Sequence, residues 1–380
     1  GDEVYEGISG QVAVNINGNV YSGNYNATVQ SEAGNTLSVS SGTFSGIMAE
    51  EGNLILSEKA IQEGLDDTYN KLKDYIQFEY LFDAVYANRV EAPDNSWSAV
   101  YDHSQTPDDS KVSMLWNDAF DLLNQVNLLM GSAEQVIATE ETRKLLEAQG
   151  FAIRAYLNLK LMKWFGALPV VDEPFAELPP RNMEEQVIDW INHNGDFAVA
   201  FLPESWPGED SDRMTKSFAL GVLSRTALRD IDFAKAFVYS SENMSSCNHS
   251  LGSSNGNFQA DNPEIYWGFA KADNQEFNDF FSKGDYVPAF RHTETYLLAA
   301  TAGFLLGNAS EALTYVNALR ARRGEPDLTV LTLDDLYLEF NTELNLEGES
   351  FFLMKIFDKV DEELQLDGYR YLLPIPSGVL

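Results

Sequence analysis

The sequence of 380 residues contains one cysteine, Cys247, and few basic residues. A single thiol excludes an intramolecular disulfide and a cysteine-based zinc site. The 25 lysines and arginines stand against 59 aspartates and glutamates, which gives a formal net charge of −34. Nucleic acids and anionic lipid headgroups are bound through basic surfaces, so this balance argues against both kinds of partner.

Long apolar runs and familiar catalytic motifs are also missing. No apolar run approaches the length that spans a bilayer, and the residues after Gly1 are expected to be a mature terminus without a signal peptide. The chain has no glycine-rich phosphate loop, no G-x-S-x-G turn and no zinc-type pair of histidines. Its histidines are therefore expected to be ordinary loop or surface residues, and the sequence predicts no cofactor, no metal site and no catalysis.

What is present falls into two parts that meet near residue 56. Residues 8–56 alternate short β-rich runs with Asn-Gly and Gly-Asn pairs, which is typical of hairpins. A segment of about fifty residues buries little apolar surface alone. Residues 1–56 are therefore predicted to form a small antiparallel β-unit that leans on a second domain, residues 57–380. A disordered or strand-adding stalk is the alternative.

From Ser57 onward the pattern is helical. Ser57 is a good N-cap, and apolar residues such as Ile61, Leu65 and Leu72 recur at three- and four-residue steps. Helices are predicted over residues 145–165, 183–201, 215–239, 293–306, 309–323 and 333–346. The predicted fold is mostly α: a helical-repeat body of tetratricopeptide-like pairs with a small N-terminal β-unit.

Several motifs follow one another along the helical part. They are EAQGFAIRAYL at 147–157, PRNMEEQV at 180–187, RMTKSFAL at 213–220, FRHTETYLLAA at 290–300, LEGESFFL at 346–353 and YLLPIP at 371–376. Their content and order resemble the SusD/RagB family of outer-membrane lipoproteins, from about residue 56 to the end. The sequence departs from the family pattern at Ser350, where arginine is usual, and between Trp267 and Arg291, where the family carries a longer insert.

The resemblance implies a function. Members of the family capture glycans or other nutrients at the outer cell surface and deliver them to a TonB-dependent (SusC-like) outer-membrane transporter, without catalysis. The resemblance also implies a SusD-type helical fold and a lipid-modified cysteine upstream of this chain. Contact with the outer membrane is therefore expected only through that anchor.

Candidate ligand residues are aromatic side chains in polar loops. Sugar rings stack on flat aromatic faces, and amide, carboxylate and guanidinium groups hydrogen-bond to sugar hydroxyls. In the segment 88–101, Trp97 and Tyr101 are predicted to stack on a ligand, and Arg89 and Asn95 to hydrogen-bond to it. Tyr286 is predicted to add a ligand-facing aromatic from another loop. For Trp97 the alternative is equally open, namely that the indole plugs the loop onto the helical body.

Carboxylates are too abundant to indicate an active site by themselves. Glu343 and Glu347 are four residues apart, so on one helix they share a face. There we expect them to meet basic groups of a neighbouring helix rather than to act as a glycosidase pair. The expected partners are Arg320, Arg322 and Arg323. Asp- and Asn-rich segments such as Asp94-Asn95 lack the spacing of a calcium loop and are expected to be solvated.

Two other functions are left open by the sequence. The first is a helical-repeat scaffold that binds only protein, its sugar site lost with the shortened insert. The absence of exposed aromatic rings at Trp97, Tyr101 and Tyr286 would favour this scaffold. The second is a carbohydrate-active enzyme, which requires two carboxylates that converge beside those rings.

Overall fold

The computed structural model describes residues 5–17, 20–31, 36–47, 57–137, 139–174, 178–206, 212–246, 249–252, 258–272, 274–366 and 368–379. The α-helices are α1 (Glu58–Tyr86), α2 (Ser98–Tyr101), α3 (Ser110–Val136), α4 (Glu140–Phe165), α5 (Glu184–Phe201), α6 (Lys216–Arg229), α7 (Phe233–Ser246), α8 (Gln275–Phe280), α9 (His292–Leu305), α10 (Ala309–Arg323), α11 (Leu333–Leu344), α12 (Ser350–Ile356) and α13 (Val360–Leu364). Short 3-10 turns cover Asn95–Trp97 and Gly368–Tyr371. The prediction of a mostly α fold is confirmed. Cys247 lies outside the described residues.

The N-terminal strands pair as an antiparallel meander. β1 (Tyr5–Asn17) pairs with β2 (Val20–Ser31), and β2 pairs with β3 (Thr36–Ile47). This is the pairing that the Asn-Gly and Gly-Asn pairs predict. Residues 48–56 lie outside the described residues. The division of the chain into domains 1–56 and 57–380 stays a prediction.

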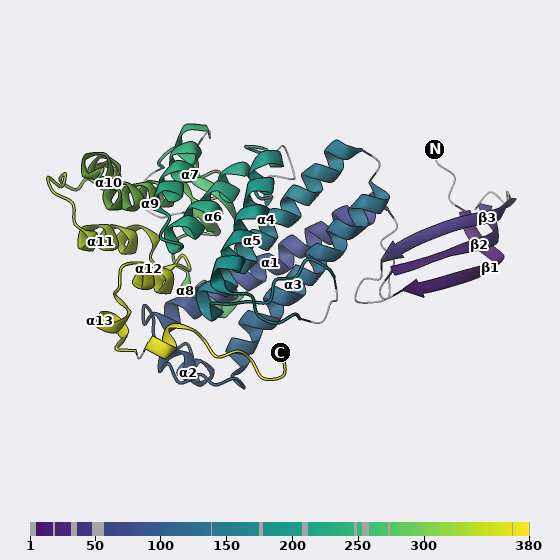
Figure 1. Cartoon of the computed structure of the whole chain (residues 1–380), viewed down its shortest axis with the longest axis horizontal. Helices are drawn as coiled ribbons and strands as arrows, with labels where there is room; N and C mark the ends of the chain where they lie inside the picture. The colour runs from purple at the N-terminus through teal and green to yellow at the C-terminus, as the bar shows by residue number, and fades with distance from the viewer. Residues whose placement is uncertain are drawn as a thin grey trace.

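The helices of the body pack mainly against their neighbours in the chain. α3 contacts α4, α4 contacts α5, α5 contacts α6, and α6 contacts α7, while α9 packs on both α7 and α10. Figure 1 shows this array, with α1 beside α3. Small residues allow the close approach: a Cβ atom at Gly150 of α4 would lie 2.6 Å from the Sδ atom of Met130 on α3. That the pairs follow tetratricopeptide geometry stays a prediction.

The helix predicted over residues 215–239 is two helices, α6 and α7, so that prediction is wrong. Ile231 adopts a left-handed conformation with φ of +61°. The Asp232 carboxylate then accepts a hydrogen bond from the backbone N–H of Lys235 at 3.0 Å, which helps to start α7. α7 turns back to pack on α6 and α9. The Asp-Ile-Asp turn contains neither glycine nor proline, so the usual stop signal is missing from the sequence.

A two-stranded antiparallel sheet precedes α9. β4 (Ile265–Ala270) pairs with β5 (Tyr286–Arg291), and α8 lies in the connection between the strands. Tyr286 begins β5 and is 8% exposed, and its hydroxyl donates to the carbonyl oxygen of Gly268 at 2.8 Å. The expectation that Tyr286 projects from a loop is therefore wrong, because strand pairing holds its ring against the sheet.

A cluster of buried charges joins α1, α4 and the N-terminus of α12. Lys160 pairs with Glu79 at 3.0 Å and with Glu349 at 2.6 Å, and Lys163 pairs with Asp83 at 3.1 Å. All five side chains are buried. Asp83 also accepts hydrogen bonds from the first two backbone N–H groups of α12, at 2.8 and 3.2 Å. Removing one member would leave a buried charge without its partner, so the cluster ties the C-terminal motif to the first helices.

A second group of buried charges surrounds the end of α11. Glu343 pairs with Arg322 at 2.5 Å and also with Arg323, which confirms that it meets the arginines of α10. Glu347 instead pairs with Arg291 at 2.8 Å and Lys283 at 2.6 Å. α11 ends at Leu344, so Glu347 no longer shares a helix face with Glu343. Both carboxylates therefore have the structural partners that the sequence favoured over a catalytic pair.

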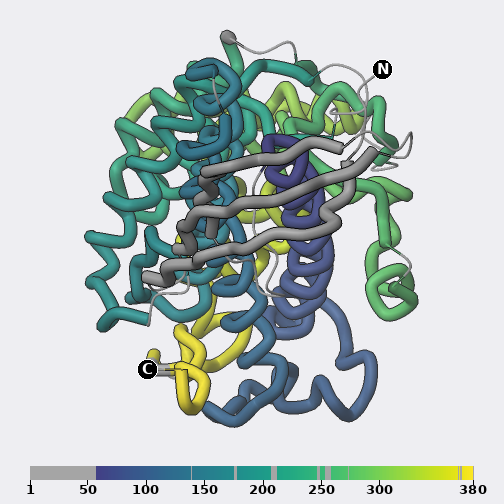
Figure 2. Tube along the Cα trace, turned by 90° about the vertical axis from the view of Figure 1, so that its right-hand side faces the viewer, coloured from purple at the N-terminus to yellow at the C-terminus, as the bar shows by residue number. Residues whose placement is uncertain are grey.

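The C-terminal segment runs back across the body. The backbone N–H of Leu373 donates to the carbonyl of Trp164 at 2.7 Å, and that of Ser377 donates to the carbonyl of Pro107 at 2.9 Å. Figure 2 shows this segment in yellow beside the blue loop that precedes α3. The helical spacing of Trp116, Trp164 and Trp190 predicts core positions; Trp116 and Trp164 are buried in the core, whereas Trp190 is only partly buried. Within the described ranges, no helix has both the length and the apolar character needed to cross a membrane.

Candidate functional site

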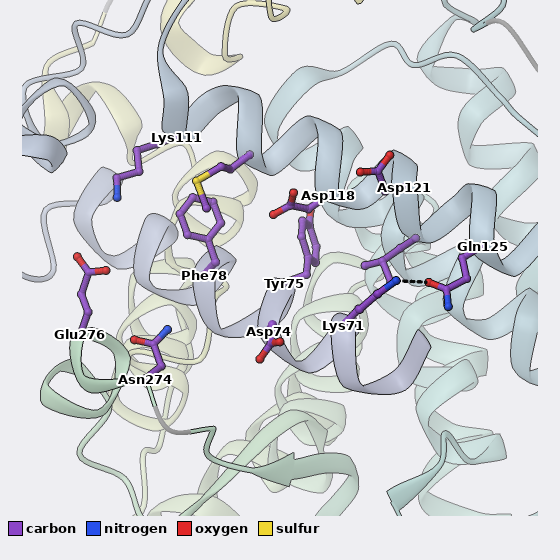
Figure 3. Close-up of a pocket in the computed structure, with 12 residues that line it drawn as sticks. Lys71, Asp74, Tyr75, Phe78, Lys111, Asp118, Asp121, Gln125, Asn274 and Glu276 are labelled. Carbon is purple, nitrogen blue, oxygen red and sulfur yellow. Dashed lines mark hydrogen bonds between the residues drawn. The ribbon is translucent and has the colours of Figure 1, made fainter. Parts of the chain in front are cut away.

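An open groove of about 450 Å³ lies between α1 and α3 and reaches the segment that begins α8. Figure 3 shows the side chains of α1 and α3 that border it, with those of the α8 segment at one end. Towards the other end, Lys71 of α1 donates a hydrogen bond to the Oε1 atom of Gln125 on α3, at 3.4 Å. We call this space the α1–α3 groove.

The α1 wall is built from one face of the helix. Lys71, Asp74, Tyr75 and Phe78 line the groove, and their spacing of three and four residues places them on the same side. The Tyr75 side chain is only 2% exposed, and its hydroxyl has no hydrogen-bond partner within the part of the chain that the structure describes. Burial raises the pKa of Tyr75 well above its usual value, so the hydroxyl stays a donor at any ordinary pH. Phe78 beside it is half-buried.

The α3 wall carries a lysine, a thioether and carboxylates. Its first turn is fixed by Asp109, whose carboxylate accepts hydrogen bonds from the backbone N–H groups of Lys111 and Val112, at 2.8 and 3.2 Å. This cap places Lys111 and then Met114, which is 41% exposed, along the groove. Asp118 follows one turn later. Desolvation, reinforced by the neighbouring Asp121, raises the pKa of Asp118.

The end wall comes from the residues before and inside α8. The Asn274 side chain caps α8 by accepting a hydrogen bond from the backbone N–H of Phe277 at 3.1 Å, which sets Glu276 in the first turn. The Oε1 atom of Gln77 accepts a hydrogen bond from the backbone N–H of Ala272 at 3.3 Å and so joins this segment to α1. Asn274 and Glu276 thus line the groove from a connection that is hydrogen-bonded to α1.

Trp97 lies behind this end wall. The indole is fully buried, with its ring 5.7 Å from that of Phe78 and 6.3 Å from that of Phe82, and the Nζ atom of Lys111 lies 4.0 Å from the ring centre. Its Nε1–H donates to the Glu276 carboxylate. The expectation of an exposed stacking ring is therefore wrong, and the alternative, an indole that plugs the loop onto the body, describes Trp97. Three of its neighbours line the groove, so Trp97 positions groove residues instead of facing the groove itself.

The other candidates from the sequence are not gathered around one ligand site. Arg89 forms an ion pair with Glu363 at 2.9 Å and donates to the Tyr337 hydroxyl at 2.9 Å, so its guanidinium is used within the fold. Asn95 is exposed and Tyr101 half-buried. Neither lines the α1–α3 groove. Ligand binding by these residues stays a prediction.

Sequence reasoning missed the groove residues because it searched polar loops for aromatic rings. Tyr75 and Phe78 lie within a long amphipathic helix, where aromatic residues usually belong to the core. Asp118 lies on α3 among solvated helix charges. The only signal of a groove in the sequence was that polar Asp74 and apolar Phe78 are four residues apart, so they lie next to each other on one face of the helix.

Metal coordination finds no support in the described ranges, which contain no group of three or more histidine, cysteine, aspartate or glutamate side chains arranged to hold an ion. Asp94, considered as a calcium ligand, instead caps the 3-10 turn Asn95–Trp97, and its carboxylate accepts a hydrogen bond from the backbone N–H of Ser96 at 2.7 Å.

Two family profiles match consecutive parts of the chain. The profile described as "Starch-binding associating with outer membrane", of SusD-like proteins, matches residues 45–228, and that of the SusD family matches residues 232–372. The chain belongs to the SusD family. The family resemblance of its motifs is thereby confirmed. A comparison with curated proteins finds no match.

Solved structures of SusD-like proteins have the same fold. A SusD-like protein from Bacteroides fragilis is 15% identical, with a TM-score of 0.73 over 84% of this chain and 94% of that one. A laminarin-binding SusD-like protein is 16% identical, with a TM-score of 0.71 over 85% and 97% of the two chains. Surface glycan-binding protein A from Bacteroides uniformis is 18% identical, with a TM-score of 0.66 over 84% and 94%. At these identities the likeness establishes the fold.

Proposed function

We propose that this SusD-family chain binds a glycan in the α1–α3 groove without converting it. The observation that carries the proposal is Tyr75, which lines the groove and whose buried hydroxyl has no partner among the described residues. Such a group costs free energy unless a ligand or water accepts its hydrogen bond. The adjoining Phe78 ring offers an apolar face, and Asp74, Asp118 and Asn274 offer polar atoms for sugar hydroxyls.

The family description and two relatives of the same fold also bear on the location and the partner of the chain. Its family is described as associating with the outer membrane, and two relatives of the same fold are named for laminarin binding and for surface glycan binding. We therefore infer a lipid-anchored protein on the outer surface that passes its glycan to a TonB-dependent (SusC-like) transporter. The transporter would supply the energy for import.

The test is calorimetric titration of neutral oligosaccharides into the wild type, Tyr75→Phe and a matched control, Tyr156→Phe. The control loses a hydroxyl that is equally buried and equally unpartnered among the described residues, but it lies in the core on α4. We expect saturable binding by the wild type with no new sugar products. Loss of one hydrogen bond to the ligand should weaken binding by Tyr75→Phe about three- to tenfold, with the control unchanged.

Three results would contradict the proposal. If the wild type binds none of the oligosaccharides tested, a glycan is not the ligand. If Tyr75→Phe and the wild type bind with equal affinity, the α1–α3 groove is not the binding site. Shorter sugars released during incubation, measured by chromatography, would show an enzyme.

A protein-only scaffold is the second candidate, and one observation favours it. Trp97 and Tyr286, the rings expected to stack on sugars, are both buried. Under this alternative the wild type binds its purified transporter in size-exclusion chromatography but binds no oligosaccharide in the titration.

A further inference from the structure

The open part of the α1–α3 groove is rich in carboxylates. Asp74 of α1, Asp118 and Asp121 of α3, and Glu276 of α8 line it, and the only cationic groups among its described lining residues are two lysines. A charged or polar ligand in the groove therefore meets more negative than positive groups, within a chain whose net charge is −34.

The two lysines are engaged by the protein. Lys71 forms an ion pair with Asp67 at 3.1 Å and donates to Gln125 at 3.4 Å. Lys111 lies over the ring of Trp97, with 4.0 Å from its Nζ atom to the ring centre. Within the described ranges, neither ammonium group forms an ion pair with Asp74 or Asp118 of the groove.

Two of the carboxylates are available to a ligand. Asp74 of α1 and Asp118 of α3 both line the groove, and within the described ranges neither accepts a hydrogen bond nor forms an ion pair. Desolvation raises the pKa of both, and the neighbouring Asp121 adds to the rise for Asp118. A carboxylate in such surroundings is stabilised by a cation brought close to it.

Tyr75 supplies an observation that does not depend on charge. Tyr75 belongs to the lining of the groove, its side chain is 2% exposed, and its hydroxyl has no partner among the described residues. Figure 3 shows the Tyr75 ring reaching from α1 toward Asp118 on α3. A ligand seated there finds a hydroxyl donor and a carboxylate acceptor in one place. An amino sugar presents the complementary pair, a hydroxyl oxygen next to an ammonium group.

We propose that the groove prefers saccharides with free ammonium groups, of the glucosamine type, over their N-acetylated and acidic counterparts. This specificity rests on the proposed glycan binding. The ammonium group pairs with Asp118 or Asp74, and a neighbouring sugar hydroxyl accepts from Tyr75. Acidic sugars are disfavoured because they would place a carboxylate or sulfate against the carboxylates of the groove.

The test compares three tetramers by calorimetry: glucosamine, N-acetylglucosamine and galacturonic acid. The first two differ only in N-acetylation, which removes the charge of the amine and adds an acetyl group, so the salt dependence of their affinity ratio reports the part due to charge. We expect the glucosamine tetramer to bind at least about fivefold more tightly than the N-acetylated one, and this ratio to shrink at high salt. The galacturonic acid tetramer should bind least.

Variants separate a site from general attraction to an acidic protein. Asp118→Asn removes one groove charge, and Asp327→Asn removes one charge from the exposed loop after α10. Asp118→Asn should lower the affinity for the glucosamine tetramer about three- to fivefold and leave that for the N-acetylated tetramer nearly unchanged. Asp327→Asn should bind both as the wild type does.

The outcomes also distinguish this inference from the proposed function. Equal binding of the glucosamine and N-acetylglucosamine tetramers overturns the preference and leaves glycan binding in place. Equal losses in Asp118→Asn and Asp327→Asn also overturn it, because the attraction then belongs to the whole surface. Absence of binding by all three tetramers and by every neutral oligosaccharide overturns both.

Discussion

Replacing Gly348 by alanine tests whether the C-terminal motif is built around a residue without a side chain. Gly348 has φ of +74°, and a Cβ atom there would lie 2.1 Å from the Cδ1 atom of Tyr80. The Tyr80 ring is fully buried and its hydroxyl donates to the carbonyl of Pro288 at 2.8 Å, so the ring has no room to swing away. The Gly348 carbonyl also accepts hydrogen bonds from Lys160 and Lys163, at 3.2 and 2.9 Å.

Two costs therefore add. The left-handed backbone costs alanine about 1 kcal/mol, and overpacking against a fixed core ring costs about 2 kcal/mol more. Gly324 provides the matched control: its φ is +73°, but a Cβ atom there would meet nothing within 4 Å. Gly324→Ala should therefore carry only the cost of the left-handed backbone. The predicted losses in the free energy of unfolding are about 3 kcal/mol for Gly348→Ala and about 1 kcal/mol for Gly324→Ala.

Differential scanning calorimetry measures the difference. For a body of this size we expect Tm to fall by about 4 °C for Gly348→Ala and by about 1.5 °C for Gly324→Ala. Equal shifts in the two variants would refute the reasoning, because the contact with Tyr80 would then carry no cost.

Two further predictions concern the end wall and the buried charges. Trp97→Phe keeps an aromatic ring in the core but removes the donor to Glu276, so it should lower the free energy of unfolding by about 1–2 kcal/mol in urea titrations; an unchanged value would show that the bond contributes nothing. Burial favours the neutral form of Glu347, but Arg291 and Lys283 outweigh it and hold its pKa below 4.5. Its contribution to stability is therefore fully present above about pH 4.5 and is lost as the pH falls through the lower pKa of the folded state. The deficit of Glu347→Gln, roughly 3–5 kcal/mol at neutral pH, should shrink on acidification, and a deficit independent of pH down to pH 3 would contradict this linkage.

The sequence was sufficient for the helical body because its signals are local. The cap at Ser57, the three- and four-residue steps of α1 and the glycine that ends α4 each act within a few residues. The family motifs added the order of the segments. The turn between α6 and α7 was missed because it depends on a left-handed Ile231, which is 72% exposed, and has no glycine or proline to mark it.

The candidate site was harder to predict because its parts are distant in the chain. Trp97 lies in a polar loop, which suggested an exposed indole. The indole is buried, however, and donates a hydrogen bond to Glu276, 179 residues further along the chain. Whether a tryptophan in such a loop faces solvent or core depends on what the fold brings over it. Conversely, Phe78 looked like a core residue from its place in the helix, but it is half-buried and lines an open groove.

The bond between Asp83 and the start of α12 joins positions 267 residues apart, with consequences for when the molecule can fold. During synthesis, α1 and α4 leave the ribosome long before Glu349, the carboxylate that pairs with Lys160. Packing the two helices earlier would bury ammonium groups without all of their partners, which is costly. The body therefore completes its fold only when nearly the whole chain is available. We therefore expect a chain that is truncated after residue 345, and so lacks Glu349 and α12, not to form the folded body.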